Sequence, residues 1–289
     1  MSAGYADIYR SPAGVDVVLG AYRQLLDEWP VPHERLRLPT REGDTFVLAS
    51  GPVEAPPVLA LHGSMSNASA WLPQIAALAP HLRVLAVDMI GEPGLSAPAR
   101  PRLGSEAYAR WLDDVLGGLG LSQVAMLGVS LGGWLAVDYA TRRPGRVTRL
   151  ALLTPAGIGR HKVEVLAQAI LLRHFGDWGR RRTLRLAIGG TRFDGDEQAA
   201  ALGEFALLAA EHFKPRMEPI PTFDDDTLGR LTMPVLAIAG GRDLMLDSRQ
   251  TRARLEHAVP HATVTLLPEA GHLLPDQSAP VLRFLSGTG

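Results

Sequence analysis

Short, unbroken runs of apolar residues recur along most of this chain and constrain its fold more than any other feature. A strand that is covered on both faces by other elements has this composition. Before these runs, Leu36–Leu38 and Thr45–Ala49 flank a turn-forming Glu-Gly-Asp and predict a hairpin. The runs that predict buried strands are Val58–Leu61, Val84–Val87, Val124–Leu127, Leu150–Leu153, Val235–Ala239 and Thr263–Leu267.

Helical patterns alternate with these strands. They cover Ala68–Leu78, Ser105–Leu116, Leu131–Arg142, Ser248–Ala258 and Ala279–Leu285. Strands and helices in alternation predict a mostly parallel sheet with right-handed crossovers and helices on both faces. Counting the hairpin, we expect an α/β fold with an eight-stranded sheet.

Two segments depart from this alternation. Ser11 and Pro12 begin an amphipathic helix, so residues 1–32 are expected to form a helical extension. No strand is recognisable in residues 158–230, which contain helical patterns and are too long for an ordinary loop. We expect this segment to be a helical lid inserted after the sixth strand. The core would then consist of residues 1–157 and 231–289.

Composition excludes several classes of function. The chain of 289 residues has no cysteine, which excludes disulfides, thiolate metal sites and a cysteine nucleophile. Its 29 Lys and Arg residues balance 30 Asp and Glu residues, so nothing drives it towards nucleic acid or an anionic membrane. No signal peptide or membrane-spanning run is recognisable, and no His, Asp or Glu positions have metal-ligand spacing. We expect a cytoplasmic protein without a cofactor, and leave its oligomeric state open.

The strongest chemical motif is Gly-Val-Ser-Leu-Gly at residues 128–132, which reads G-x-S-x-G. It directly follows a predicted strand and directly precedes a predicted helix, where a nucleophile elbow belongs. Glycines are needed because side chains flanking so tight a turn would clash. Ser130 is therefore the candidate nucleophile, and we expect it to have a strained backbone.

A serine hydroxyl needs a base, and the base needs an acceptor that holds its tautomer. Among nine histidines, His272 has the right place, because it follows Ala-Gly just after the last predicted strand. Asp243 follows the preceding strand through Gly-Gly-Arg and is the favoured acceptor. Asp247 is the rival, although it stands where an acidic residue favours a helix start.

An oxyanion formed at the substrate carbonyl needs backbone donors. The amide of Leu131, directly after the serine, is one candidate. The amide of Ser64, in the His-Gly-Ser that ends a predicted strand, is the second, with Met65 as the alternative. His62 is expected to brace this loop.

Together these motifs resemble the α/β-hydrolase superfamily. They are His62-Gly63 with Trp71, Asp88 to Gly91, Gly128 to Gly133, Pro234-Val-Leu, Gly240 to Asp243 and Ala270 to His272. The Val-Asp-Met-Ile-Gly segment and the place of the insertion resemble bacterial carboxylesterases of the naproxen-esterase type. In one place the chain departs from the superfamily's usual Asp-x-x-Gly-x-Gly-x-Ser, because the segment from Asp88 to Ser96 is one residue longer.

The resemblance implies Ser130 as nucleophile, His272 as base, Asp243 as acid, and Ser64 and Leu131 as the oxyanion hole. It favours hydrolysis of a small or medium carboxylic ester through an acyl-enzyme, without a metal. A thioesterase, a lactonase, a C–C bond hydrolase, a non-hydrolytic cyclase and a ligand-binding relative stay open. Candidate contacts of the small-molecule substrate are Met65, Trp71, Leu171 and Phe175.

Overall fold

The structure is a computed structural model that describes the chain except residues 1–4, 163–175, 177–178, 180–181, 183–196 and 288–289. An eight-stranded sheet forms its centre, in the order β1-β2-β4-β3-β5-β6-β7-β8. The first two strands pair antiparallel, β2 is also antiparallel to β4, and all later pairs are parallel. The expected mostly parallel sheet is confirmed. The strands are β1 (His33–Leu38), β2 (Thr45–Ser50), β3 (Pro57–Leu61), β4 (Arg83–Val87), β5 (Val124–Val129), β6 (Val147–Leu153), β7 (Val235–Gly240) and β8 (Thr263–Leu267).

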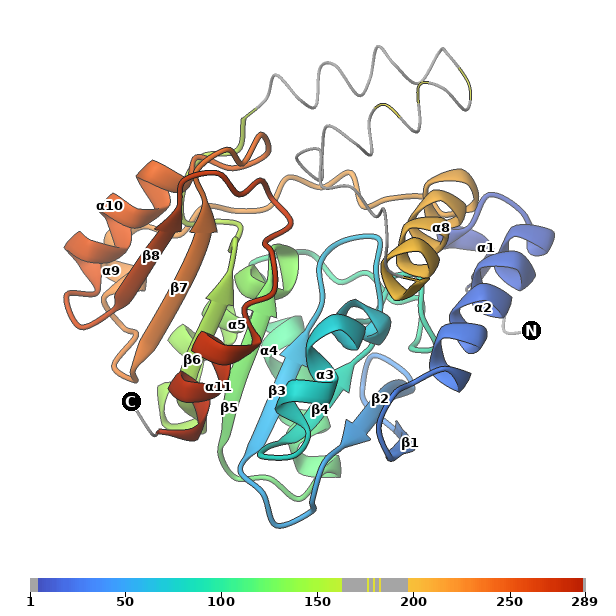
Figure 1. The fold of residues 1–289 in the computed structure, drawn as a ribbon, viewed down its shortest axis with the longest axis horizontal. Coiled ribbons are helices and arrows are strands. Elements are labelled where there is room, and N and C mark those ends of the chain that lie inside the picture. Colours follow the sequence, from blue (N-terminus) through green and yellow to red (C-terminus); the bar gives the residue numbers. More distant parts are fainter. Residues whose placement is uncertain (1–4, 163–175, 177–178, 180–181, 183–196, 288–289) are drawn as a thin grey trace.

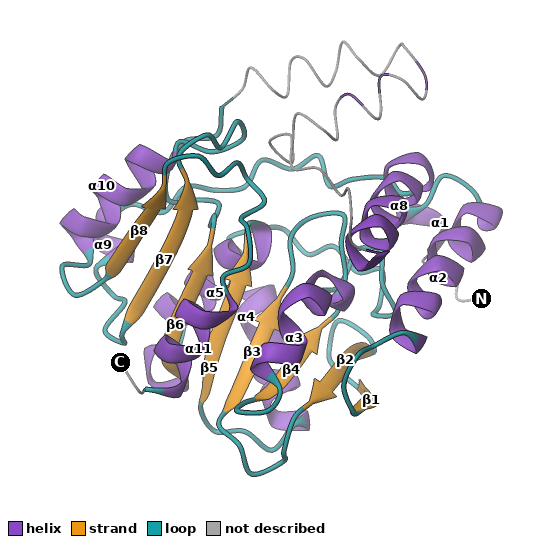
Figure 2. Cartoon of the chain, in the orientation of Figure 1, coloured by secondary structure: helices purple, strands orange, loops and turns teal. Residues whose placement is uncertain are grey.

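Helices cover both faces of this sheet, as the alternating pattern predicted (Figures 1 and 2). The short helices α1 and α9 lie in segments expected to be helical, although neither was predicted as a separate helix. The helix predicted from Ala68 begins as a 3₁₀ turn. Part of the expected lid, including a helical pattern at Val163–His174, lies outside the described residues. The described helices are α1 (Tyr5–Ile8), α2 (Pro12–Asp27), η1 (Ala68–Trp71), α3 (Leu72–Leu78), α4 (Glu106–Gly118), α5 (Leu131–Arg142), η2 (Pro144–Arg146), α8 (Glu197–His212), α9 (Asp225–Leu228), α10 (Ser248–Ala258) and α11 (Ser278–Ser286).

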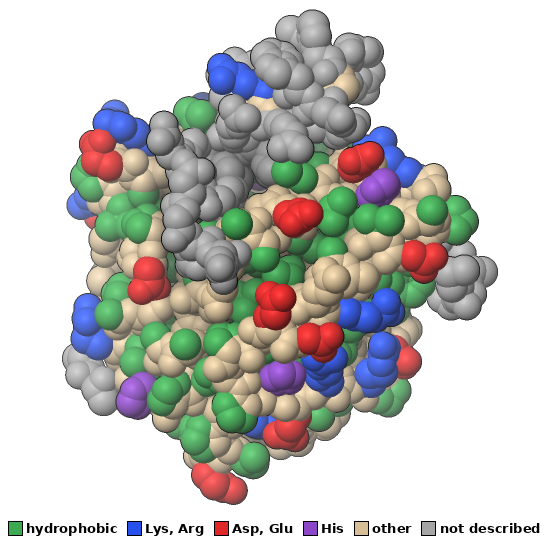
Figure 3. Space-filling model, turned by 45° about the vertical axis from the view of Figure 1, so that its right-hand side comes forward, with side chains coloured by type: hydrophobic (Ala, Val, Ile, Leu, Met, Phe, Trp, Pro, Cys, Tyr) green, Lys and Arg blue, Asp and Glu red, His purple; other side chains and the backbone are tan. Residues whose placement is uncertain are grey.

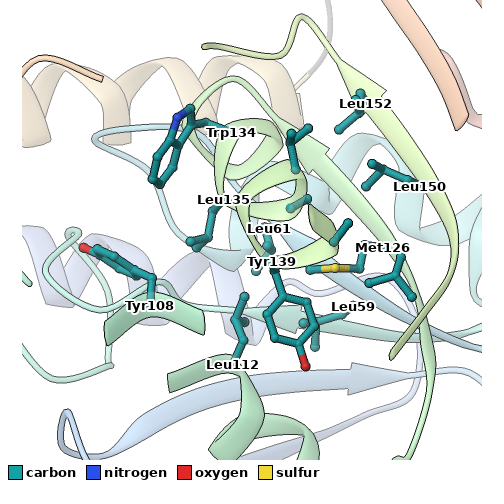
Figure 4. Packing of buried hydrophobic residues seen from close by; sticks show 14 of the residues in the cluster. Leu59, Leu61, Tyr108, Leu112, Met126, Trp134, Leu135, Tyr139, Leu150 and Leu152 are labelled. Atoms are coloured by element: carbon teal, nitrogen blue, oxygen red, sulfur yellow. The ribbon is translucent and has the colours of Figure 1, made fainter. Parts of the chain in front are cut away.

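The strands divide the apolar core into two layers, because successive side chains point to opposite faces. In β3, Leu59 and Leu61 join the layer beneath α4 and α5, whereas Val58 and Ala60 join the layer beneath α2, α3 and α11. Figure 4 shows Leu135 and Tyr139 of α5 near Leu112 of α4 and Leu59 and Leu61 of β3, in the same core layer. The continuous apolar runs in the sequence therefore reflect burial on both faces.

The N-terminal helix α2 is part of this core. Ser11 caps it by accepting the Gly14 N–H at 3.1 Å, as its position in the sequence indicated. Val18, Tyr22 and Leu26 are fully buried along one side. Helix α8 lies beside α2, and on this side of the molecule basic and acidic side chains are interspersed (Figures 1 and 3). No helix in the described part of the chain has the length and apolar character needed to cross a membrane.

Candidate active site

Ser130 lies at the sharp turn between β5 and α5. Its backbone has φ 53° and ψ −114°, a conformation that side-chain-bearing residues rarely adopt. The Ser130 N–H donates to the Leu153 carbonyl of neighbouring β6 at 3.1 Å, and its carbonyl accepts the Trp134 N–H at 3.0 Å. The strain that the motif predicted is present, and hydrogen bonds on both sides of the serine hold it in place.

The two glycines of the motif are required by close backbone approaches. A Cβ on Gly132 would collide with the carbonyl oxygens of Leu61 and His62 at the end of β3. A Cβ on Gly128 would lie 2.5 Å from the Gly132 carbonyl oxygen. Helix α5 can therefore start directly beneath the strand ends, which brings Ser130 to the carboxyl edge of the sheet.

Ser130, His272 and Asp243 form a hydrogen-bonded series. The His272 Nε2 lies 3.0 Å from Ser130 Oγ, and the His272 Nδ1 lies 2.7 Å from Asp243 Oδ2. Asp243 is 1% exposed and His272 is 7% exposed, whereas Ser130 is partly accessible. When Nδ1 carries the ring proton and donates it to Asp243, Nε2 is free to accept the serine proton.

The loop that carries Asp243 packs against the loop that carries His272. A Cβ on Gly240, at the end of β7, would collide with the carbonyl oxygens of Ala270 and Gly271. Asp243 Oδ1 accepts the N–H groups of Met245 and Leu246 at 2.7 and 3.0 Å. Burial opposes ionisation of Asp243, but hydrogen bonds from His272 and these amides, with the charge of His272, hold its pKa below the ordinary value.

Asp247, the rival acid, has a different place. Its side chain accepts the Gln250 N–H at 3.0 Å and caps helix α10. The structure therefore brings Asp243, and not Asp247, to His272.

The candidate oxyanion donors lie on both sides of Ser130. The Leu131 amide begins α5, directly after the serine. Gly63 lies beside Ser130 from the loop after β3, because a Cβ on Gly63 would be 3.6 Å from the Ser130 Cβ. The Met65 N–H already donates to Glu92 Oε2 at 2.7 Å, which favours Ser64 over Met65 as the second donor.

His62 braces the same loop. Its Nε2 accepts the Met89 N–H at 2.9 Å, so its Nδ1 carries the proton and donates it to the Gly63 carbonyl at 2.8 Å. Full burial lowers the pKa of His62 to about 4, so the ring is neutral at neutral pH. In a trans peptide the N–H points away from the carbonyl, so this bond also sets the direction of the Ser64 N–H.

The candidate substrate contacts have different environments. Met65 is partly buried and packs against the core layer beneath α2 and α3. Trp71 is 2% exposed within that layer, and its contact with substrate stays a prediction. Leu171 and Phe175 lie outside the described residues. In the described part of the chain, no three His, Asp or Glu side chains are grouped so that they could hold a metal ion.

Three polar contacts near the site were not predicted. Besides the Glu92–Met65 bond, Lys162 Nζ donates to the Asp243 carbonyl at 2.6 Å, and Tyr22 of α2 donates to Asp88 at 2.7 Å. Each contact joins residues far apart in the sequence, so the spacing of apolar residues could not predict it. The extra residue between Asp88 and Ser96 was the one available sign that this loop differs from the usual pattern.

A parallel sheet with a serine elbow at its carboxyl edge and a histidine and an aspartate after its last two strands defines an α/β-hydrolase. The sequence pattern of the Alpha/beta hydrolase family matches residues 58–285. The chain therefore belongs to this family, and the expected fold is confirmed.

Bacterial carboxylesterases are similar to the chain over nearly its whole length. Carboxylesterase YbfK of Bacillus subtilis is 30% identical over 287 residues, which is 92% of this chain and 93% of the relative. The crystal structure of carboxylesterase CesB (YbfK) has a TM-score of 0.83 and covers 95% of this chain and 99% of its own. The crystal structure of naproxen esterase (carboxylesterase NP) from Bacillus subtilis is 28% identical, with a TM-score of 0.79, and covers 91% of this chain and 94% of its own. The resemblance to carboxylesterases of the naproxen-esterase type is confirmed.

Proposed function

We propose that this protein is a serine carboxylesterase that cleaves a small or medium carboxylic ester through an acyl-enzyme. The observation that carries the proposal is the series Ser130–His272–Asp243, with distances of 3.0 and 2.7 Å, at a strained elbow. The carboxylesterases that resemble the chain at about 30% identity favour an ester over the other acyl compounds that such a triad can attack.

In the proposed reaction, Ser130 Oγ attacks the ester carbonyl carbon while its proton passes to His272 Nε2. Asp243 stabilises the imidazolium, and the N–H groups of Ser64 and Leu131 stabilise the oxyanion. The intermediate expels the alcohol, which takes the proton from His272, and the acyl-enzyme is left. Water then attacks the acyl carbon with His272 again as the base, and release of the carboxylic acid restores the Ser130 hydroxyl.

We further propose that residues 158–230 form a lid that selects the acyl group, above a core of residues 1–157 and 231–289. The apolar helical patterns within this segment and its place after β6, whose carboxyl end lies at the edge that carries Ser130, support the proposal. Met65, Trp71, Leu171 and Phe175 are the proposed contacts of the substrate.

Labelling with a fluorophosphonate tests the proposed nucleophile. Peptide mapping should find the label on Ser130 alone. Ser130→Ala should lower kcat for a short-chain nitrophenyl ester by at least about 10⁴-fold, because the serine, histidine and aspartate act as one unit.

The matched control is Ser122→Ala, which changes an exposed serine before the same strand and should leave kcat unchanged. Hydrolysis that survives in Ser130→Ala, or a label on another residue of the folded protein, would refute the proposal. A panel of matched esters, thioesters and lactones then establishes the preferred bond.

A further inference from the structure

Glu92 is a buried carboxylic acid that the proposed triad does not use. It belongs to the loop of residues 88–105 between β4 and α4, here called the β4 loop, and it is 3% exposed. Its Oε2 accepts the N–H of Met65 at 2.7 Å. Among the described residues, no basic side chain forms a salt bridge with it. The carboxyl group is therefore directed at a backbone amide next to Ser64.

Met65 needs such a partner because its backbone is strained. With φ 59° it is one of three side-chain-bearing residues with positive φ in the described part of the chain, together with Ser130 and Thr154. A backbone in this region persists only where its surroundings hold it. The Glu92 carboxylate holds Met65 at its amide, which is part of the peptide unit that follows Ser64.

The peptide unit before Ser64 is held separately. The Gly63 carbonyl accepts a proton from His62 Nδ1 at 2.8 Å, as described above. Ser64 is thus fixed on both sides, by His62 through one peptide unit and by Glu92 through the next. The Ser64 N–H belongs to the first of these units, and the second unit restricts its rotation because the two are joined at the Ser64 Cα.

Further hydrogen bonds tie the loop after β3, residues 62–67, to the β4 loop. None of these further bonds involves a residue adjacent to Ser64, whereas the Glu92–Met65 bond does. The bonds are Met89 N–H to His62 Nε2 at 2.9 Å and Asn67 Nδ2 to the Pro93 carbonyl at 2.9 Å. Directly after the loop, the Ala68 N–H at the start of η1 donates to Asp88 Oδ1 at 2.8 Å.

The surroundings of Glu92 are apolar on one side and basic on the other. It lines a small cavity whose other walls are apolar except for Tyr108. The charges of Arg100 and Arg216 favour the ionised form of Glu92 without a direct bond to it. Arg100 Nε donates to the Gly91 carbonyl at 2.9 Å, and Arg216 donates to Tyr108 Oη at 2.6 Å. Burial is the largest cause of the raised pKa of Tyr9, to which the charge of Glu92 also contributes.

We propose that Glu92 is a positioning residue for the oxyanion hole. Its ionised carboxylate holds the Met65 N–H, and through it fixes the Ser64 N–H in the direction of the developing oxyanion. This inference rests on the proposed hydrolase function, since it requires an oxyanion at the carbon that Ser130 attacks.

The proposal has a consequence for pH dependence. Burial raises the pKa of Glu92 to about 7, although the Met65 N–H, Arg100 and Arg216 oppose this shift. As the pH falls through 7 the carboxylate takes up a proton and becomes a weaker acceptor. In the wild type, kcat should therefore fall by about fivefold as the pH drops through 7 and Glu92 becomes neutral. Burial also raises the pKa of Asp88, to about 6, so its proton would be taken up at a lower pH.

Glu92→Gln tests the role of the charge. Glutamine keeps the length and an oxygen acceptor, but a neutral hydrogen bond is weaker by roughly 1 kcal/mol, so kcat should fall about fivefold on the alkaline plateau while KM stays the same. The fall of kcat through pH 7 that protonation of Glu92 causes in the wild type should be absent from Glu92→Gln. The matched control is Glu218→Gln, because Glu218 also accepts a backbone N–H, from Leu103, but it does so away from Ser64. Its kcat and acid limb should match the wild type.

Glu92→Ala removes the acceptor, and kcat should fall about 10²-fold or more, as after loss of an oxyanion donor. An alkyl boronic acid, whose tetrahedral adduct on Ser130 places an oxygen in the oxyanion hole, should bind more weakly by a similar factor. The product carboxylic acid should bind as in the wild type. Equal losses for both ligands would mean a purely structural role and overturn the proposal.

Thermal unfolding shows whether each variant is folded, and if Glu92→Ala is not, Glu92→Gln decides. A folded Glu92→Gln with wild-type kcat and an unchanged fall of kcat through pH 7 overturns the positioning role. Failure of the hydrolase function itself is a different result, because Ser130→Ala would then retain activity while the Glu92 variants would have no common effect on kcat.

Discussion

Two oppositely directed influences act on the carboxyl group of Asp243. Burial disfavours its charge, and three hydrogen bonds with the charge of His272 favour it more strongly. The same carboxylate therefore orients the His272 ring and keeps its own negative charge in a nearly dry site. Asp247, four residues further on, does not orient the His272 ring, because its side chain caps α10.

Asp243→Asn should lower kcat by roughly 10⁴-fold while the protein stays folded, because an amide can hold the wrong tautomer of the histidine. Asp247→Asn should leave kcat within about twofold and stability nearly unchanged, since asparagine caps a helix as well as aspartate does. Steady-state kinetics and urea unfolding of the two variants provide the measurement. The reverse order of effects on kcat would assign the acid to Asp247.

At the scale of elements, burial and close backbone contacts explain which element boundaries and glycine positions the sequence could predict. The boundaries of α5, α10 and β3 agree with the pattern within one residue, because burial on fixed faces determines their periodicity. The glycine positions of the elbow were also readable, since only glycine tolerates the carbonyls that face residues 128 and 132. Contacts such as Glu92–Met65 were not readable, because two irregular loops meet there without any repeating pattern.

Gly132→Ala tests this close approach. The added methyl group would collide with the carbonyl oxygens of Leu61 and His62, which are backbone atoms and cannot turn aside. We expect a loss of about 1–3 kcal/mol or more in the free energy of unfolding, together with a lower kcat. Chemical denaturation measures the first quantity and ester hydrolysis the second.

The control is Gly20→Ala in the interior of α2, where a Cβ would meet nothing within 4 Å. This substitution should stabilise the protein by about 0.5–1 kcal/mol, because alanine loses less backbone freedom in a helix. Equal effects of the two substitutions would show that α5 can move away from the sheet.

At the scale of the whole molecule, the N-terminal segment and the segment after β6 meet on one side. Tyr9 pairs with Phe213 as an isolated bridge, and the two rings contact each other edge to face at 5.4 Å. From α2, Tyr22 reaches Asp88 in the β4 loop. The sequence predicted helices in both segments but not the contact between the segments, because periodicity identifies a buried face and not the element that covers it.

Phe205→Ala tests whether the packing of α8 on α2 contributes to the stability of the whole molecule. Phe205 is 4% exposed, and its ring lies 6.2 Å from the ring of Tyr22. Removing a buried phenylalanine ring costs about 3–5 kcal/mol, so the thermal midpoint should fall by several degrees. Met217→Ala, which truncates a side chain that is 76% exposed in the same segment, should change stability by less than about 0.5 kcal/mol. Labelling of Ser130 at 25 °C should be equally fast in both variants, since neither residue contacts the triad. Equal midpoints would mean that α8 contributes little to the cooperative unit, and α2 would then be stabilised by the sheet and η1 alone.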